Sequence, residues 1–343
     1  MFQLNKTPLS FVRRPLAAAA AALGLACALV TTQAAAETVV PLATWGGANH
    51  VSIREFVPSM ERALKELGPH NIKFQHFPGG QLGQDKDMPM AIPLGQVKFA
   101  WVTVNGWSGV APDAKVLDAP TGHTMQQLDE IIERPNGMFS LLKKRFAEKN
   151  TVLLGMADLG PPAIVSREPI LSPADLKGKK VRVFSEGTSD AVRLLGGAPV
   201  FVAFAELYTA LQHGTIDAAL VGFQGVDSQK LHEVTKHVLV PASFFGTAMM
   251  GWAANPQWLN SMPAGDRKVF LEAVRRSELE NRKAIVADLD KLTKLYQDRG
   301  MKVAFLNPSM KEYNVWRDAT SPLLDRARVQ LSPEMAALIT PKK

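Results

Sequence analysis

The sequence predicts an α/β protein in which helices cover both faces of a parallel sheet. Short runs rich in Val, Ile and Phe alternate with amphipathic runs over most of the chain, and this alternation is typical of parallel sheets with crossover helices. Further on, no proline or glycine interrupts the chain from Asp266 to Arg299. A helix of that length measures about 50 Å, which is more than one small domain covers. The chain of 343 residues is also long enough for two domains.

The predicted strands and helices are separated by turn signals. Glycine pairs at 46–47 and 79–80 turn the chain, and Gly68-Pro69 ends the first helix. The predicted strands are, in chain order, Val39–Trp45, Asn71–Phe77, Val97–Val104, Thr151–Met156, Ala163–Ser166, Lys180–Phe184, Val200–Ala203 and Ile216–Val221. The predicted helices between them are Ser52–Leu67, Lys86–Leu94, a helix after Gly187, and Ala205–Gln212.

The stretch from Asp266 to Arg299 has two interpretations at this point. Its apolar residues recur at helical spacing; they are Phe270, Val274, Ile285, Leu289, Leu292 and Tyr296. One interpretation is a single helix that lies across two domains. The other is a pair of helices with a bend near Glu278–Lys283.

The first 36 residues are typical of a secretory signal peptide. Cationic residues, Arg13 and Arg14 among them, precede an apolar run from Leu16 to Val30, and Ala34–Ala36 has the small residues of a cleavage site. The apolar run of about 15 residues is shorter than the roughly 20 that span a bilayer. We therefore expect export and cleavage after Ala36, with a retained anchor as the alternative. The arginine pair is also compatible with twin-arginine export.

The rest of the composition excludes several functions. Cys27, in the leader, is the only cysteine, so the mature chain has no disulfide, thiol nucleophile or thiolate metal site. Loss of the leader's three cations lowers the net charge from +7 to +4, without the basic cluster that nucleic-acid binding needs. The seven histidines lack metal-binding spacing. We expect no cofactor, metal or nucleic acid.

Arg182 is anomalous within its predicted strand. Val181 and Val183 flank it, and because side chains alternate along a strand, Arg182 points to the opposite face. Burying a charge there is costly unless it is paired. Ligands of open α/β sheets bind beyond the carboxyl ends of the strands, and the arginine fork matches a carboxylate. A bound carboxylate, an ion pair within the fold and solvent exposure all stay open from spacing alone.

Three segments resemble one known family. Residues 204–217 (FAELYTALQHGTID) resemble the signature of the solute-binding proteins of tripartite ATP-independent periplasmic (TRAP) transporters, dicarboxylate-binding (DctP) type. Residues 77–83 (FPGGQLG) resemble the family's loop after its second strand. Residues 172–183 (SPADLKGKKVRV) resemble its approach to the ligand arginine. The three segments occur in the family's order.

The resemblance implies a two-domain periplasmic-binding-protein (Venus flytrap) fold with a long C-terminal helix crossing both domains. It places domain I at 37–160 plus about 243–280, and domain II at 161–242 plus about 281–343. The implied function is capture of an organic acid in the periplasm and its delivery to the small and large membrane subunits of a TRAP permease. We expect a monomer that is not an enzyme.

The resemblance also implies a ligand site. The family's ligand arginine falls on Arg182, and Phe204 matches an aromatic of its cleft. Thr103 and Asn105 lie where the family contacts ligand. Further expected contacts at the same edge are Trp45, Asn49 and Trp101.

Two positions depart from the family pattern. Val221 stands where many members have a ligand-contacting Asn, and Pro162 stands where some have a second arginine. We expect Phe223 and Gln224 to replace these contacts. Because polar groups need partners when buried, the losses favour a monocarboxylate with an apolar or aromatic body.

Three other functions stay open. One is a periplasmic sensor subunit that presents its ligand to a receptor kinase. Another is an organic-acid lyase or isomerase on the same fold, although no convincing base or nucleophile accompanies Arg182. The third is a flytrap of the ABC-transporter type, which the signature segment and the long helix disfavour.

Overall fold

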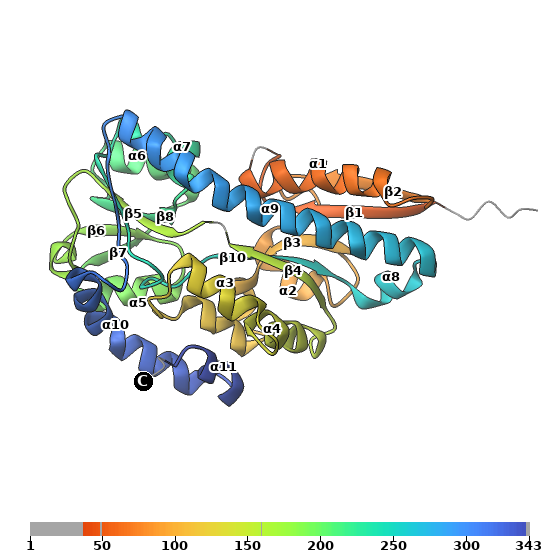
Figure 1. Ribbon diagram of the computed structural model, residues 1–343. Coiled ribbons are helices and arrows are strands. Elements are labelled where there is room, and N and C mark those ends of the chain that lie inside the picture. Colours follow the sequence, from red (N-terminus) through yellow and green to blue (C-terminus); the bar gives the residue numbers. More distant parts are fainter. Residues whose placement is uncertain (1–36, 49, 159, 341–343) are drawn as a thin grey trace, which may run out of the picture. The chain divides into compact units, whose positions relative to one another are not determined.

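The computed structural model describes residues 37–48, 50–158 and 160–340, so the predicted leader lies outside the described residues. Glu37 onward forms one compact unit built on two sheets (Figure 1). The first sheet has the order β2-β1-β3-β10-β4, with β1 Thr38–Thr44, β2 Ile72–Phe77, β3 Phe99–Thr103, β4 Val152–Asp158 and β10 Met249–Ala254. The second has the order β11-β9-β5-β8-β6-β7, with β5 Pro162–Ser166, β6 Lys180–Val183, β7 Ala198–Phe201, β8 Ala218–Gly222, β9 His237–Val240 and β11 Lys302–Phe305.

Helices cover these sheets, and several begin at a side-chain cap. Ser185 caps α5 by accepting a hydrogen bond from the backbone N–H of Thr188, and Thr124 and Asn255 cap α3 and α8 in the same way. The α-helices are α1 Val51–Glu66, α2 Met88–Ala91, α3 Met125–Glu133, α4 Met138–Ala147, α5 Glu186–Leu194, α6 Leu207–Gln212, α7 Gly225–Ser228, α8 Pro256–Ser261, α9 Ala264–Asp298, α10 Lys311–Gln330 and α11 Pro333–Leu338. Two 3₁₀ helices matter for the site, η2 Val104–Trp107 and η3 Pro112–Asp118.

The expectation of purely parallel sheets is wrong, because both sheets are mixed. Strand β10 is antiparallel to β3 and β4, and β5 is antiparallel to β8 and β9. The chain passes between the sheets from β4 to β5 and from β9 to β10. The two antiparallel strands, β5 and β10, are the ones that directly follow these links, and the local pattern of a strand does not give its direction relative to its neighbours.

The long stretch forms one helix, α9, with 35 residues, so the interpretation with a bend into two helices is wrong. Its first half buries Phe270 and Val274 in the core beside the first sheet, and its second half buries Tyr296 in the core beside the second. Helix α9 contacts α1, β4 and β11, and Figure 1 shows it running along both halves of the fold. The predicted helix across both halves of the fold is therefore confirmed.

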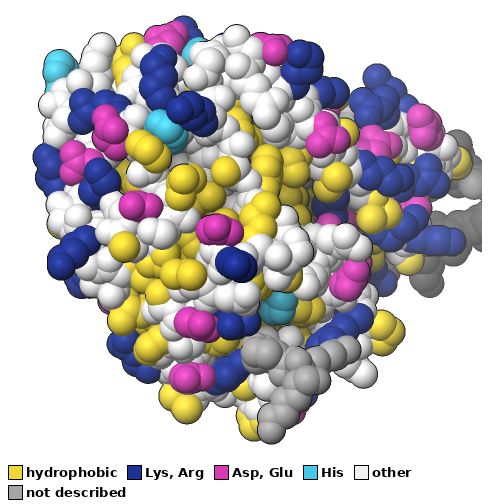
Figure 2. Space-filling model, turned by 60° about the vertical axis from the view of Figure 1, so that its left-hand side comes forward, with side chains coloured by type: hydrophobic (Ala, Val, Ile, Leu, Met, Phe, Trp, Pro, Cys, Tyr) yellow, Lys and Arg dark blue, Asp and Glu magenta, His cyan; other side chains and the backbone are white. Residues whose placement is uncertain are grey.

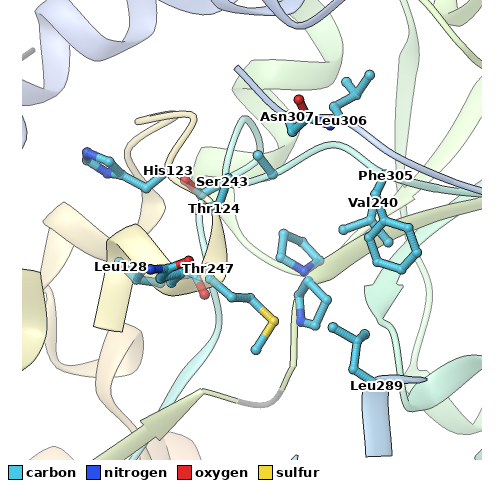
Figure 3. A pocket seen from close by; sticks show the side chains of 15 residues that line it. His123, Thr124, Leu128, Val240, Ser243, Thr247, Leu289, Phe305, Leu306 and Asn307 are labelled. Carbon is cyan, nitrogen blue, oxygen red and sulfur yellow. The ribbon is translucent and has the colours of Figure 1, made fainter. Parts of the chain in front are cut away.

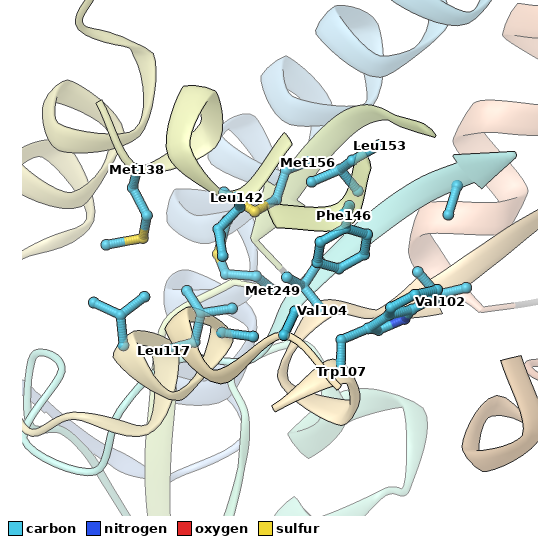
Figure 4. Packing of buried hydrophobic residues seen from close by; sticks show 14 of the residues in the cluster. Val102, Val104, Trp107, Leu117, Met138, Leu142, Phe146, Leu153, Met156 and Met249 are labelled. Carbon is cyan, nitrogen blue, oxygen red and sulfur yellow. The ribbon is translucent and has the colours of Figure 1, made fainter. Parts of the chain in front are cut away.

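Hydrophobic cores cover both faces of each sheet, as expected for this fold class. On one face of the first sheet, the ring of Phe146 in α4 stacks on Trp107 with ring centroids 4.4 Å apart (Figure 4). Helix α10 contributes Leu323 to a core of the second sheet and Leu324 to a core of the first. The predicted domain limits stay a prediction. Because α10 contributes to a core of each sheet, its packing does not assign this helix to the second domain alone.

The surface mixes charges of both signs. Figure 2 shows a face on which hydrophobic side chains gather in the middle, with Lys and Arg interspersed among Asp and Glu around them. None of the helices within the described ranges is both long and apolar enough to cross a membrane.

Candidate ligand-binding site

Arg182 lies on β6, which is next to the edge of the second sheet, between β8 and the edge strand β7. Its side chain is buried, with 7% of the residue exposed. The Nε–H group donates to the carbonyl of Val202 at 3.0 Å, just beyond β7, and Nη1 donates to the carbonyl of Leu220 in β8 at 2.8 Å. The guanidinium therefore bridges the carboxyl end of β7 and the middle of β8.

This guanidinium has no anionic partner in the described part of the chain, where no carboxylate oxygen lies within 4 Å of it. Burial lowers the pKa of Arg182 to about 10, so the group still carries its charge at neutral pH. The ring of Phe184 lies 5.6 Å from its Cζ atom. A guanidinium offers five N–H donors, and the two neutral carbonyls use only part of them. An anion at this position would restore what burial costs.

A small cavity of about 170 Å³ lies next to these strand ends. Its walls include Phe204 and Gly222, each two residues beyond a carbonyl that accepts from Arg182. Across from them lies His50, at the start of α1. The other lining residues are Arg54, Gln224, Gly225, Asp227, Ser228, Asp288 and Leu292. Residues from both halves of the fold thus enclose one cavity.

A larger cavity of about 600 Å³ lies where Phe184 and the N-terminus of α5 face η2. Thr103 and Asn105 line it, as do Asp118 and Ser185. Burial raises the pKa of Asp118 above the usual value for aspartate. Neighbours of Arg182 therefore line both cavities, Phe184 the larger and Gly222 the smaller.

Three aromatic rings cluster at the same edge of the first sheet. The indole rings of Trp45 and Trp101 stack with centroids 4.9 Å apart, and the His50 ring meets Trp101 edge-on at 4.7 Å. Burial lowers the pKa of His50 to about 4, so the imidazole is neutral at physiological pH. The cluster forms because β1 and β3 are parallel neighbours and α1 begins beside them.

Several buried polar atoms at this edge and across the small cavity from it have no hydrogen-bond partner in the part of the chain that the structure describes. They are Nε1 of Trp45, Nε1 of Trp101, Nδ1 of His50, and both amide atoms of Gln224. Buried polar groups in native proteins are nearly always satisfied. Their concentration here, in the described residues of both halves, indicates a place where a polar molecule completes the structure.

Two of the predicted contact residues have side chains that already interact within the protein. The side chain of Asn105 is already used within the protein, because it donates to Asp118 and Thr247 and accepts from the Met249 N–H. The ring of Phe223 is fully buried and packs against Tyr296 and Phe305, so it belongs to the hydrophobic core.

The remaining predictions at the site divide as follows. Asn49 lies outside the described residues. Phe204 and Gln224 line the small cavity, and Thr103 lines the large one. His50 was not predicted, although the glycine turn that leads into α1 ends at this residue and pointed to the same edge.

A third cavity, of about 330 Å³, lies where the chain passes between the sheets (Figure 3). Pro161, Pro162 and Ala242 from the two crossings line it, and the side chains of Val240, Leu289 and Phe305 gather on one side. None of the predicted ligand residues within the described ranges lines this cavity. Among the described residues, no group of three or more His, Cys, Asp or Glu side chains is arranged to hold a metal ion.

Two sheets joined by short links, a helix along both, and cavities lined from both halves define a two-domain α/β binding protein of the Venus flytrap class. The chain belongs to the DctP family, bacterial extracellular solute-binding protein, family 7, whose model matches residues 43–330. The resemblance seen in the sequence is thereby confirmed.

Individual relatives agree with this assignment. The chain is 24% identical over 272 residues to the C4-dicarboxylate-binding periplasmic protein DctP of Rhodobacter capsulatus, a match that covers 78% of this chain and 80% of the relative. It is 28% identical to an uncharacterized protein of Salmonella typhimurium, over 53% of this chain and 56% of that protein.

Solved structures show the same fold. A TRAP periplasmic solute-binding protein from Ochrobactrum anthropi superposes with a TM-score of 0.79 at 20% identity, covering 88% of this chain and 93% of that chain. A second, from Shewanella oneidensis with bound succinate, has a TM-score of 0.76 at 21% identity, covering 89% and 98% of the two chains.

Proposed function

We propose that this protein captures a small organic acid in the periplasm, after cleavage following Ala36, and delivers it as a monomer to the two membrane subunits of a TRAP permease. The observation that carries the proposal is the buried guanidinium of Arg182, which bonds to two carbonyls beside β6 and has no anionic partner among the described residues. The names of the relative from Rhodobacter capsulatus and of the Shewanella oneidensis structure, which refer to a C4-dicarboxylate and to succinate, support a carboxylate as the ligand.

Arg182 binds the carboxylate in this mechanism. Its two bonds to the Val202 and Leu220 carbonyls hold the guanidinium in place, so little side-chain entropy is lost when the anion binds. Phe204 and Phe184 flank the position as apolar walls. No chemical step is part of this function, because binding, closure and release are sufficient.

Ligand binding couples to closure because the small cavity takes walls from both halves of the fold. A ligand that contacts His50 on one side and Phe204 on the other favours the closed arrangement by its difference in affinity for the two states. The permease can then recognise the closed surface. The links near 157–162 and 240–245 are the proposed hinges.

A thermal-shift screen over organic acids tests the proposal. A ligand at 100 times its Kd stabilises the folded protein by about 2.7 kcal/mol, so a binding acid raises Tm measurably. We expect Arg182→Met to abolish this rise. The ligand-free variant should be as stable as the wild type or more so, because replacing a buried charge with an apolar side chain removes a desolvation cost.

Arg193→Met is the matched control, because Arg193 pairs with Asp190 on the surface and its side chain is 62% exposed. It should keep the full ligand response. If Arg182→Met binds the acid with wild-type affinity, Arg182 is not the carboxylate site. If no organic acid raises the Tm of the wild type, the proposed ligand class is wrong.

A further inference from the structure

The small cavity brings together two side chains with buried polar atoms that form no hydrogen bond within the described residues. His50 directly precedes α1, and Gln224 lies between β8 and α7. Both line the cavity of about 170 Å³. Nδ1 of His50 and both amide atoms of Gln224 are buried and make no hydrogen bond to any described residue. Only the folded chain places them in one cavity, since 174 positions separate them in the sequence.

The side chain of Gln224 lies against the link between the two sheets. It lies against Gly160 so closely that a Cβ atom on Gly160 would lie 2.0 Å from its Oε1 atom. Gly160 also has a φ of +91°, which a residue with a side chain rarely adopts. A glycine at position 160 therefore leaves the space that the Gln224 amide occupies.

The neutral imidazole of His50 is the second polar group of this cavity. Its ring packs edge-on against Trp101 and also meets Trp45 at 5.8 Å. A neutral imidazole has one donor nitrogen and one acceptor nitrogen, and an amide offers both two N–H donors and one acceptor. Together the two side chains can satisfy a group that donates and accepts at once, such as a hydroxyl.

The cavity also limits the size of the ligand and its distance from the cation. Gly222 in the cavity wall is two residues beyond Leu220 along β8, which corresponds to about 7 Å. Pockets for drug-sized ligands have about 300 to 1,000 Å³, and this cavity is smaller. A short acid can therefore place its carboxylate at Arg182 and a second polar group in the cavity.

We propose that His50 and Gln224 select the ligand by binding a hydroxyl or oxo group on a short carbon chain, so that the protein takes a small hydroxy or oxo acid. The proposal rests on the proposed function, and it replaces the expected apolar or aromatic body. That expectation came from two missing family contacts, and the structure supplies polar groups from other positions. An apolar acid would leave the His50 nitrogen and the Gln224 amide buried and unsatisfied, which costs affinity.

The experiment compares acids that differ only by the polar group: lactate with propionate, 3-hydroxybutyrate with butyrate, and malate with succinate. Benzoate and hydrocinnamate represent aromatic bodies. Affinities come from titration calorimetry of the full mature chain. We expect the hydroxylated member of at least one pair to bind about tenfold or more tightly than its partner, and the aromatic acids to bind weakly.

Two variants assign the selectivity to the named residues. Gln224→Met keeps the size of the side chain without its amide, and His50→Phe keeps a ring against Trp101 without its nitrogens. Each should reduce the preference for the hydroxylated acid to about threefold or less. Gln257→Met is the matched control, because Gln257 lies on α8 and bonds to Asn150 at the surface. It should keep the preference.

The stability of the ligand-free protein distinguishes ligand selection by Gln224 from a merely structural role of this residue. Removing an unsatisfied buried amide should leave the Tm of Gln224→Met unchanged or raise it, whereas a structural amide would lower it. Equal binding of both members in every pair, or preferred binding of an aromatic acid, overturns this inference and leaves the proposed function intact. Absence of binding by every acid overturns the proposed function and this inference with it.

Discussion

Asp118 lies against Gly187 so closely that a Cβ atom on Gly187 would lie 2.7 Å from the Cβ of Asp118. Asp118 ends η3 on the side of the first sheet, and Gly187 is in the first turn of α5 beside the second sheet. The Asp118 carboxylate also accepts a hydrogen bond from Asn105 at 3.0 Å. The two halves of the fold therefore meet through a glycine that leaves no space for a side chain.

We expect Gly187→Ala to weaken binding of the acid. The added methyl group collides with Asp118 only when the halves are together, so the ligand-free protein can avoid the collision by opening. Overpacking of this kind costs about 1–3 kcal/mol, which corresponds to about five- to 150-fold in Kd, measured by calorimetry. Gly265→Ala is the control, since Gly265 in the first turn of α9 has no atom within 4 Å of such a Cβ. Wild-type affinity of Gly187→Ala would contradict the close contact.

The buried carboxyl of Glu278 predicts a pH dependence of stability. Burial raises the pKa of Glu278 to about 7, although Nη1 of Arg282 lies 3.6 Å away. Arg282 also bonds to Asp129 and Glu133 on α3. Between the unfolded value of 4.5 and about 7, the folded protein keeps a proton that the unfolded chain has lost. Stability from this group is therefore fully present below pH 4.5 and is lost as the pH rises through 7.

Glu278→Gln should remove this contribution. The free energy of unfolding of the variant, from urea titrations at pH 5, 6, 7 and 8, should fall less with rising pH than that of the wild type. Curves that stay parallel over this range would show that Glu278 does not titrate as inferred.

Asp113 predicts the opposite pH dependence. Its carboxylate accepts from Nε of Arg145 at 2.7 Å and from the backbone N–H and the hydroxyl of Ser332. Burial by itself would raise the pKa of Asp113, but the bonds from Arg145 and Ser332 hold it below its usual value. Its contribution to stability is therefore present above the unfolded value and is lost as the pH falls through the folded value.

We expect Asp113→Ala to lower the free energy of unfolding by about 3 kcal/mol at pH 7, because it leaves buried partners unpaired. The difference from the wild type should shrink toward pH 3 in urea titrations. Asp318→Ala removes an exposed ion pair with Arg317 and should cost less than about 1 kcal/mol. A difference from the wild type that does not depend on pH would argue against the ionised form of Asp113 as the cause.

The stacked pair of Phe146 and Trp107 predicts a large packing effect (Figure 4). Phe146 has no exposed surface, and removing a buried phenylalanine costs about 3–5 kcal/mol. Phe146→Ala should show this loss in urea denaturation. Phe201→Ala is the control at a phenylalanine that is 63% exposed, and it should change stability by about 0.5 kcal/mol or less. Similar losses for both variants would contradict the role of this core.

Much of the fold could be predicted because its signals are local. The strand periods and the turn glycines located β1 to β8, and the absence of proline and glycine located α9. Strand β10 was missed because its sequence, MMGWAA, contains no β-branched residue. It lies between β3 and β4 because the chain comes back to the first sheet after the second sheet. Local sequence patterns do not predict such a connection.

The candidate site was predicted less completely. Arg182 was identifiable because a charge within an apolar strand is anomalous in any fold that buries it. Phe223 looked like a cleft residue next to Gln224, yet its ring packs in the core against Tyr296, because neighbouring residues of a turn can face opposite ways. His50 gave no signal by itself, and its role emerges only from the cavity that it shares with Gln224.

The sequence by itself determined the order of β1 to β8, the helical stretch that forms α9, the resemblance to a family, and a cation within an apolar strand. These follow from hydrophobic periodicity, glycine and proline positions, and charge, all of which are written within a few residues. Only the tertiary structure decided which polar groups share a cavity, because the start of α1, the end of β8 and part of α9 line it together although they are far apart in the sequence. Burial and the loss of hydrogen-bond partners are properties of that packed arrangement, and they arise only when residues as far apart as His50 and Gln224 enclose the same space.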